Sequence, residues 1–356
     1  MPAAPLAKSP GLWRGSDLQD SQDWIFRFTG PALDEIDAAL RKAQAKKLAP
    51  PGFGKEDFPL PGFAAELQGM LDELEHGRGF VLMRGFPAGR YSEAEAEIIF
   101  WGIGQHLGIP LSQNAEGHLL GRVRNLGLDI NQTNVRAYQT TAELIFHNDQ
   151  SDVIMLMCLK AAKSGGLSRL VSVTAVQNEI QRRRPDLLAE LYRPYCIDRR
   201  GERGREDEDD LPYYAMPVLS FHKGLVTARY IRGYIESAQR FPEVPRLGAR
   251  QVEALDLFDA IANEDGMALS FQMEPGDIQL VNNFCVLHAR TNFEDYPEPE
   301  RRRHLLRLWL AAPNSRELPP CFEKRFGTCK GGEARGGIPP SKVTVGKTEK
   351  FRLERV

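Results

Sequence analysis

The chain has 356 residues with 42% hydrophobic and 26% charged content, a composition typical of a globular protein with a sizeable core. Its formal net charge of −2 gives no electrostatic reason to expect nucleic acid or an anionic membrane as a partner. Length alone allows one large domain or two ordinary ones, so the number of domains has to come from the pattern of elements.

The cysteines indicate a reducing compartment. There are five, an odd number, and they are widely scattered without C-x-x-C spacing, which argues against a disulfide framework or a zinc knuckle. The N-terminal stretch MPAAPLAKSPGLWRGSD lacks the apolar segment of a signal peptide, and no window approaches about 18 consecutive apolar residues. We therefore expect a cytoplasmic protein.

The first third of the chain is predicted to be rich in helix. Apolar residues recur at helical spacing in two stretches, and the pair Ser92 and Glu95 forms a capping box that begins a third helix. A short apolar run between glycines is typical of a buried strand. The expected elements are an irregular arm over 1–30, helices over 33–45, 63–77 and 91–108, and a strand over 79–86.

From about residue 120 the pattern changes to short alternating segments separated by turn residues, which predicts strands. The expected strands cover 120–127, 142–150, 152–160, 167–173, 218–222, 225–231, 267–273, 276–281, 284–290 and 304–312, with helices over 174–192 and 249–264. Neither an internal repeat nor a clear linker is present. We therefore predict one domain over 1–356, a β-barrel core with helical flanks and a peripheral C-terminal tail over 313–356.

One internal stretch is open to two interpretations. Residues 198–212, DRRGERGREDEDDLP, carry clustered charge and glycine with almost no apolar content. Such a stretch is typical of a solvated loop, and long loops inside compact domains also form flaps over pockets. The sequence alone leaves both interpretations open.

The strongest signal for chemistry is His147-Asn148-Asp149 followed much later by His288. In an extended strand, residues i and i+2 point the same way, so His147 and Asp149 can bind one ion. His288 ends an alternating strand that begins with a Pro-Gly-Asp turn. Two histidines and one carboxylate hold non-haem Fe(II) on one face and leave the other positions open. Because an isolated histidine is usually structural, the other histidines are interpreted so: His76, His106, His118, His222 and His304.

The segment RRRHLLRLWL (301–310) places two kinds of side chain on opposite faces of a strand. Arg303, Leu305, Arg307 and Trp309 share one face, while the residues between them form an apolar face. An unpaired buried guanidinium is costly, so the arginine face is expected to line a cavity or to pair with structural acids. In a cavity, the two parallel donors of a guanidinium match a carboxylate.

Taken in order, these motifs resemble a known enzyme family. H-x-D, GGLSRLVSV, the PGD-led strand to His288, the Asp-Tyr loop and R-R-x-L-L-R are similar to the Fe(II)/2-oxoglutarate-dependent dioxygenases of the taurine and 2,4-dichlorophenoxyacetate dioxygenase family. The resemblance covers roughly residues 79–312. It implies an α+β fold with a mainly β core, a double-stranded β-helix (jelly roll) with flanking helices.

The resemblance also implies roles for individual residues. His147, Asp149 and His288 would bind iron, and Arg303 would bind the distal carboxylate of 2-oxoglutarate. Ser168, the hydroxyl residue after the Gly-Gly pair, would help to hold that carboxylate. Arg307 would lie beside the substrate. Two departures from the family matter: the stretch before Gly165-Gly166 is shorter, and the loop after His288 is longer, so the choice of Arg303 over its neighbours in the sequence rests on strand alternation with Arg307.

The reaction that the resemblance implies is oxidative decarboxylation of 2-oxoglutarate with O2, coupled to hydroxylation of a C–H bond. Arg307 favours a small anionic substrate: an amino acid, another carboxylate or a sulfonate. Asp149 argues against halogenation, because family members that halogenate lack this carboxylate. Desaturation, cyclisation and epimerisation remain open, as does a jelly-roll metal-binding protein without redox chemistry. We expect a small-molecule partner, and a homo-oligomer is possible.

Overall fold

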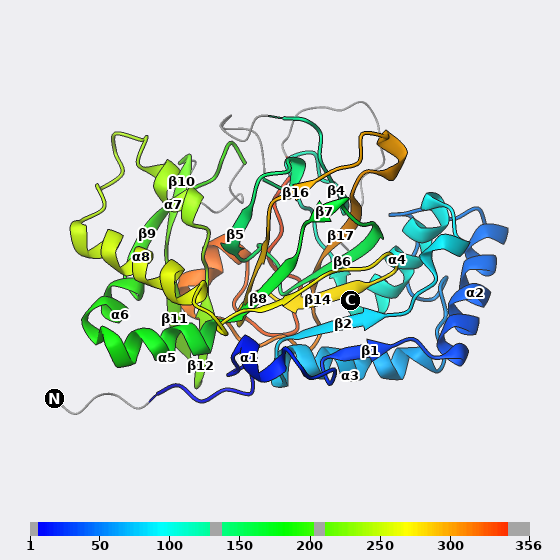
Figure 1. Ribbon diagram of the computed structural model, residues 1–356, viewed down its shortest axis with the longest axis horizontal. Coiled ribbons are helices and arrows are strands. Elements are labelled where there is room, and N and C mark those ends of the chain that lie inside the picture. Colours follow the sequence, from blue (N-terminus) through cyan, green and yellow to red (C-terminus); the bar gives the residue numbers. More distant parts are fainter. Residues whose placement is uncertain (1–5, 129–136, 203–210, 341–356) are drawn as a thin grey trace.

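The computed structural model describes residues 6–128, 137–202 and 211–340. Two sheets, antiparallel except for the β1–β2 pair, form its centre, and helices cover their outer sides (Figure 1). The larger sheet has the order β1-β2-β14-β6-β17-β3, with β4 also paired to β17, and the smaller sheet has the order β13-β8-β15-β5. The fold is a double-stranded β-helix with flanking helices, as the sequence predicts.

The strands of the larger sheet are β1 (Ile25–Arg27), β2 (Phe80–Arg84), β3 (Ile109–Pro110), β4 (Leu120–Arg124), β6 (Val153–Lys160), β14 (Ile278–Asn282) and β17 (His304–Ala311). The strands of the smaller sheet are β5 (Leu144–His147), β8 (Ser168–Ser172), β13 (Leu269–Phe271) and β15 (Val286–Arg290). Three two-stranded pairs complete the sheets: β7 (Ser164–Gly165) with β16 (Phe293–Glu294), β9 (Pro194–Asp198) with β10 (Tyr213–Pro217), and β11 (Leu219–His222) with β12 (Leu225–Ala228). The α-helices are α1 (Gly15–Leu18), α2 (Gly30–Ala45), α3 (Phe63–His76), α4 (Glu93–Leu107), α5 (Val173–Arg183), α6 (Pro185–Leu191), α7 (Arg232–Ala238), α8 (Ala249–Ala262) and α9 (Glu323–Phe326).

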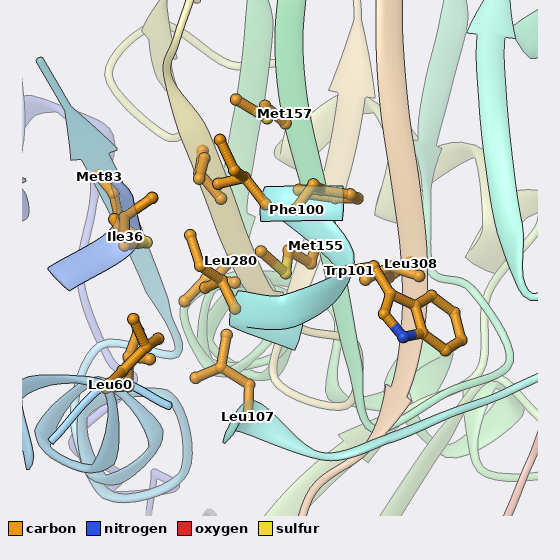
Figure 2. Packing of buried hydrophobic residues seen from close by; sticks show 14 of the residues in the cluster. Ile36, Leu60, Met83, Phe100, Trp101, Leu107, Met155, Met157, Leu280 and Leu308 are labelled. Carbon is orange, nitrogen blue, oxygen red and sulfur yellow. The ribbon is translucent and has the colours of Figure 1, made fainter. Parts of the chain in front are cut away.

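Helix α4 covers the outer face of the larger sheet. Its capping box forms as the sequence predicts: the Ser92 hydroxyl accepts from the Glu95 amide, and the Glu95 carboxylate accepts from the Ser92 amide. Large apolar side chains of α4 pack against β6, β14 and β17 (Figure 2). A Cβ at Gly104 would lie 2.5 Å from Leu308 Cδ1, so the glycine allows helix and sheet to approach closely. Each large side chain buried here contributes about 2 kcal/mol.

The two faces of β17 separate as the alternation predicts. Leu306, Leu308 and Leu310 belong to the outer cluster under α4. Leu305 and Trp309 lie instead on the inner side, between the two sheets. Arg307, on the same face as Leu305 and Trp309, therefore points to the interior of the β-helix, where it lines the cavity between the sheets.

The helix predicted over 174–192 is wrong as a single element. The structure has two helices, α5 and α6, that meet at Arg184 and Pro185. Pro185 has no N–H to continue the hydrogen-bond ladder, and Arg184 takes φ −145° and ψ 69°, outside the helical region. With α8, the two helices pack outside the smaller sheet (Figure 1).

The C-terminal segment is not peripheral over its described part, 313–340. Phe322 and Phe326 are fully buried and pack on Phe284, which leads into β15. The Arg335 side chain is fully buried, and its Nε donates to Asp152 Oδ1 at 2.8 Å. The sequence analysis missed these few anchoring side chains because Pro, Gly and Lys residues dominate the composition of the segment. The segment thus supports the turn that follows β5.

The N-terminal arm is less irregular than expected, since its described part contains α1 and β1. Trp24 packs against Phe80 and Phe271, and β1 runs parallel to β2. Of the loop over 198–212, residues 203–210 lie outside the described residues, so the choice between loop and flap is not tested. Within the described ranges, no helix is long and apolar enough to cross a membrane. The single domain over 1–356 stays a prediction.

Candidate functional site

Strands β5 and β15 bring the three predicted metal ligands together. His147 ends β5 and lies directly opposite His288 on β15, with ring centroids 4.3 Å apart. Asp149 lies just beyond β5, and its Oδ2 is 3.7 Å from His288 Nε2. One ligand atom from each residue lies within 4.8 Å of the others. In the described part of the chain no fourth His, Cys, Asp or Glu joins this group, so the arrangement is that of an open site.

Asn148, between two of these residues, holds the turn in place. Its Nδ2 donates to the carbonyls of Ala228 and Asn283, both at 2.7 Å, and its Oδ1 accepts from the Tyr230 amide at 2.9 Å. Asn283 in turn accepts from the Asp149 amide at 3.0 Å through its Oδ1. The Asn148 side chain is thus bonded to backbone groups of other segments, a clamping role that the sequence did not reveal.

The protonation states around the three residues suit a divalent metal. Burial, with a further contribution from His147, lowers the pKa of His288 to about 3, and burial also lowers the pKa of His147. For Asp149, burial acts to raise the pKa, but the charge of Arg307, the neighbouring histidine rings and the hydrogen bond from Trp309 together outweigh it, and the pKa is lowered. Two neutral imidazoles and an ionised carboxylate are the forms that bind metal.

Hydrogen bonds orient two of the ligand side chains. His147 Nδ1 lies 2.9 Å from the Ile145 carbonyl, which leaves Nε2 directed to the metal position. Trp309 Nε1 donates to Asp149 Oδ2 at 3.0 Å. The imidazole and the carboxylate are therefore both fixed before any ion binds.

Arg307 lines the cavity that also contains His147, Asp149 and His288, and it is held there by a glutamine and two aromatic rings. Its Nε donates to Gln113 Oε1 at 2.6 Å, and its guanidinium carbon lies 4.6 Å from the Tyr138 ring centroid and 5.2 Å from that of Trp309. A Cβ at Gly121 would come within 2.7 Å of Gln113 Oε1, so glycine leaves room for this pair. The two Nη groups remain for an anion in the cavity.

Arg303 lies at a second, more buried position on the cavity wall. Its backbone amide donates to Asp295 Oδ1 at 2.8 Å. Its Nη1 is buried and has no hydrogen-bond partner within the described ranges. Burial lowers the pKa of the guanidinium. An unpaired buried donor of this kind indicates a place for an anion.

Arg290 adds a second cation to this part of the site. The guanidinium carbons of Arg290 and Arg303 lie 4.6 and 5.2 Å from the centroid of the same ring, Phe293. Burial and the charge of Arg303 lower the pKa of Arg290 to about 9. Two neighbouring guanidiniums therefore raise the local positive potential.

One cavity is lined by all six residues that the sequence singled out: His147, Asp149, His288, Arg303, Ser168 and Arg307. Of the three consecutive arginines, Arg303 lines the cavity, whereas Arg302 donates to the Tyr296 and Pro297 carbonyls and Arg301 is exposed over the Tyr296 ring. Strand alternation with Arg307 was the signal that distinguished them.

Several cavity residues were not anticipated. Tyr138, Gln279 and Arg290 also line it, and Gln113 reaches it through Arg307. A signal existed for Gln279, because this polar residue stands between Ile278 and Leu280 in a central strand. Nothing in the sequence pointed to Tyr138 or Gln113, which precede the metal-binding turn in irregular segments.

Comparison with known proteins identifies the family. The sequence model of the "Taurine catabolism dioxygenase TauD, TfdA family" matches residues 44–309, which is most of the chain. The chain belongs to this family. It is therefore an Fe(II)- and 2-oxoglutarate-dependent dioxygenase, with O2 as the third reactant, as the resemblance implied.

Individual relatives cover nearly the whole length. FR-33289 synthase of Streptomyces rubellomurinus is 30% identical over 316 residues, which cover 86% of this chain and 91% of the relative. A taurine hydroxylase-like protein of Stachybotrys chartarum is 29% identical over 307 residues, 83% and 77% of the two chains.

Solved structures share the fold of this dioxygenase at low sequence identity. Asparagine oxygenase in complex with Fe(II), 3-hydroxyasparagine and succinate has a TM-score of 0.59 and 16% identity, covering 81% of this chain and 93% of the other. The non-haem iron oxygenase OrfP with Fe and α-ketoglutaric acid has a TM-score of 0.58 and 14% identity, covering 80% and 93%. At these identities the likeness concerns the fold.

Proposed function

We propose that this dioxygenase hydroxylates a small anionic substrate, with iron bound by His147, Asp149 and His288. The observation that carries the proposal is that one cavity has a group that could bind a metal at one place and, at another, a buried arginine donor without a partner among the described residues. A dicarboxylic 2-oxo acid has matching ends: an oxo acid that chelates a metal and a distal carboxylate. In this proposal Arg303 and Ser168 bind the distal carboxylate.

The donor set of this chain fits the cosubstrate. Apolar side chains of Leu156 and Leu305 line the same cavity and suit the two methylene groups between the polar ends. When bound, Fe(II) with 2-oxoglutarate and O2 supplies oxidative decarboxylation and the oxidation of a substrate C–H bond. The protein itself contributes orientation, a dry cavity and an open coordination face.

Arg307 is the residue that would bind the substrate anion. Because Gln113 takes its Nε and two rings cover its faces, the guanidinium is fixed with its two Nη groups available. Its charge lowers the pKa of Asp149, so it lies close to the proposed metal position. An anion held there brings neighbouring C–H bonds near the iron. Two relatives are named for taurine and for uridine-5'-phosphate, both of which carry an acidic group.

A spectroscopic titration tests this proposal. Anaerobic protein is loaded with Fe(II) and titrated with 2-oxoglutarate, and the weak visible charge-transfer band of the chelate is followed. Succinate is then measured in air with matched pairs of amino acids, carboxylates or sulfonates and their neutral analogues. We expect the band, and more succinate with an anionic member of a pair. Absence of both band and succinate would refute the proposal.

A variant at Arg307 separates substrate from cosubstrate. Arg307→Met should leave the anaerobic band in place and remove the preference for the anionic member of each pair. Product analysis then distinguishes hydroxylation from desaturation, cyclisation or epimerisation. A variant that loses the band but keeps the preference would show that Arg307 does not bind the substrate.

Location and further partners are also proposed. All five cysteines are free, which supports a reducing compartment such as the cytoplasm. The net charge of −2 supports a function without nucleic acid or an anionic membrane surface. A homo-oligomer is compatible with the proposal, and sedimentation would decide it.

A further inference from the structure

Gln279 is a buried polar residue that lines the cavity and has no assigned role. It is 2% exposed and lies in the middle of β14, a central strand of the larger sheet. Its neighbours Ile278 and Leu280 belong to the outer cluster under α4, so Gln279 points to the inner side, where it lines the cavity. A glutamine in this position costs free energy unless its amide is hydrogen-bonded.

The amide oxygen of Gln279 lacks a hydrogen bond. Its Oε1 is buried and has no partner among residues 6–128, 137–202 and 211–340. The residues paired with Gln279 across the sheet are Leu82 on β2 and Leu156 on β6, and their apolar side chains offer no donor. An amide oxygen can only accept, so the group that would complete it is a hydrogen-bond donor.

Strand pairing places Gln279 level with Arg307. Leu156 on β6 is paired on one side with Gln279 on β14 and on the other side with Arg307 on β17. All three side chains line the same cavity. Adjacent strands are about 4.8 Å apart, so the backbones of Gln279 and Arg307 are separated by about 10 Å. A small molecule that lies over Leu156 can therefore contact both polar side chains.

The two polar side chains match two different groups of one ligand. Arg307 Nε is taken by Gln113, and the Nη groups only donate, so they match an anion. Gln279 Oε1 matches an N–H or O–H group. A half-turn of the last torsion would present Nε2 instead, but the positive charge of Arg307 at the same level favours the oxygen. A ligand with an acid group and a donor group a few bonds apart satisfies both residues.

The charges around the cavity indicate that this donor group is neutral. Among the described residues that line the cavity, Asp149 is the only acid, and it belongs to the proposed iron site. Three arginines line the same cavity, namely Arg290, Arg303 and Arg307. A buried ammonium group would meet this positive charge without a further carboxylate to pair with, which is costly. A hydroxyl or an amide N–H has no such cost.

We propose that Gln279 accepts a hydrogen bond from the substrate, and that the substrate is a small anion with a neutral hydroxyl or amide N–H group. The proposal rests on Arg307 as the anion-binding residue of the proposed function, and it narrows that substrate class. The acid group would lie at Arg307, the donor group at Gln279 and the carbon chain between them over Leu156. Gln279 would then select substrates by the spacing between their acid and donor groups.

Three sulfonates with one carbon chain serve as probes of this role. Ethanesulfonate has no donor, 2-hydroxyethanesulfonate has a neutral donor and 2-aminoethanesulfonate has an ammonium group. Each is titrated by calorimetry into anaerobic protein saturated with Fe(II) and 2-oxoglutarate, and a second set with a three-carbon chain covers a longer spacing. In at least one set, the hydroxy compound should bind about tenfold more tightly than the other two, as for one additional hydrogen bond.

Variants assign this difference to one residue. Gln279→Met should remove the advantage of the hydroxy compound and leave the affinity for the plain sulfonate unchanged. Gln105→Met removes another glutamine amide, whose Nε2 is buried without a partner in the described residues, on α4 and outside the cavity lining, and should keep the advantage. An advantage that survives in Gln279→Met would overturn the inference, as would an amino compound that binds wild type as tightly as the hydroxy compound.

Two further measurements keep the test decisive. Thermal unfolding shows whether each variant is folded, and Gln279→Leu replaces Gln279→Met if the latter is not. Arg307→Met in the same titrations tests the proposed function and should weaken the binding of all the sulfonates. Wild type that binds none of them, or Arg307→Met that binds them normally, would overturn the anion site and the inference with it. Weak binding by Arg307→Met and an unchanged hydroxy advantage in Gln279→Met would overturn the role of Gln279 alone.

Discussion

The two ends of the cavity differ in how complete they are without ligands. At the metal end, Asn148 and Asn283 hold the turn, the Ile145 carbonyl orients His147 and Trp309 orients Asp149. His288 Nδ1 at this end is buried without a partner in the described part of the chain. At the arginine end, the buried Arg303 Nη1 likewise has no partner there. Hydrogen bonds therefore preorganise two of the three residues at the metal end, whereas the Arg303 guanidinium keeps a donor that a ligand would satisfy.

This difference has a physical reason. A metal binds tightly through charge and needs only correctly placed ligand atoms, so the fold can use internal hydrogen bonds to orient them. A carboxylate is held by hydrogen bonds that strong internal partners would compete for. Leaving Arg303 Nη1 unsatisfied should therefore destabilise the free protein and, in the proposed function, strengthen binding of the cosubstrate. Variants that remove a clamping residue at the metal end should therefore lower the free energy of unfolding, whereas removal of the Arg303 guanidinium should raise it.

The largest effect is expected from His147→Ala at the metal end. Loss of a direct ligand should weaken Fe(II) binding by more than the roughly 10- to 100-fold that is typical when a residue hydrogen-bonded to a ligand is lost. The charge-transfer band and succinate formation should therefore disappear. Anaerobic Fe(II) titration with the visible spectrum measures this. His222→Ala, at a half-buried histidine paired with Glu317 away from the cavity, is the matched control and should keep the band. A band of normal intensity in His147→Ala would contradict the metal assignment.

Asn148→Ala should damage the metal end by another route. The change removes two hydrogen bonds donated by Nδ2 and leaves buried carbonyls of Ala228 and Asn283 without a donor. We expect a loss of about 3 kcal/mol in the free energy of unfolding and metal affinity weakened about 10-fold or more. Asn125→Ala, at a surface turn, should change neither by a comparable amount. Urea unfolding without metal, together with metal titration, distinguishes the two effects.

The contrast between the ends also explains what could be predicted from the sequence. The cluster of two histidines and one carboxylate, the two faces of β17 and the capping box at Ser92 follow from local periodicity and short motifs, and the structure contains them. Arg303 could be distinguished from Arg302 because alternation with Arg307 depends only on strand geometry. Each of these motifs involves residues that lie close together in the sequence, so a local pattern is enough to predict it.

Other features depend on contacts between distant segments. Arg335 is buried against Asp152, and Gln113 holds Arg307 across 194 positions of sequence. No local pattern marks such pairs, so the C-terminal segment was wrongly expected to be peripheral. The division of the helix over 174–192 is different, because Pro185 was visible and its effect was underestimated.

At the arginine end, Arg303→Met should have opposite effects on affinity and stability. Removal of a buried cation with an unpaired donor should raise the free energy of unfolding of the ligand-free protein by about 1 kcal/mol. The same change should weaken the binding of 2-oxoglutarate by about 10- to 100-fold, because a hydrogen-bonded charge pair is lost. Arg302→Met is the matched control, since that side chain lies outside on loop carbonyls. A simple loss of stability with unchanged affinity would mean that Arg303 is structural.

The smallest effect is expected from Trp309→Phe, which removes one N–H while keeping a ring beside Arg307. Asp149 Oδ2 then loses its donor at 3.0 Å, so we expect metal affinity to fall about tenfold with 2-oxo acid binding at saturating metal little changed. Trp101→Phe, which loses an indole bond to the Phe53 carbonyl in the outer cluster, should lower stability and leave metal affinity alone. If both variants weaken metal binding equally, the effect comes from a general loss of stability. If only Trp309→Phe does, the preorganised metal end extends beyond its three proposed ligands to β17, the strand that carries Arg307.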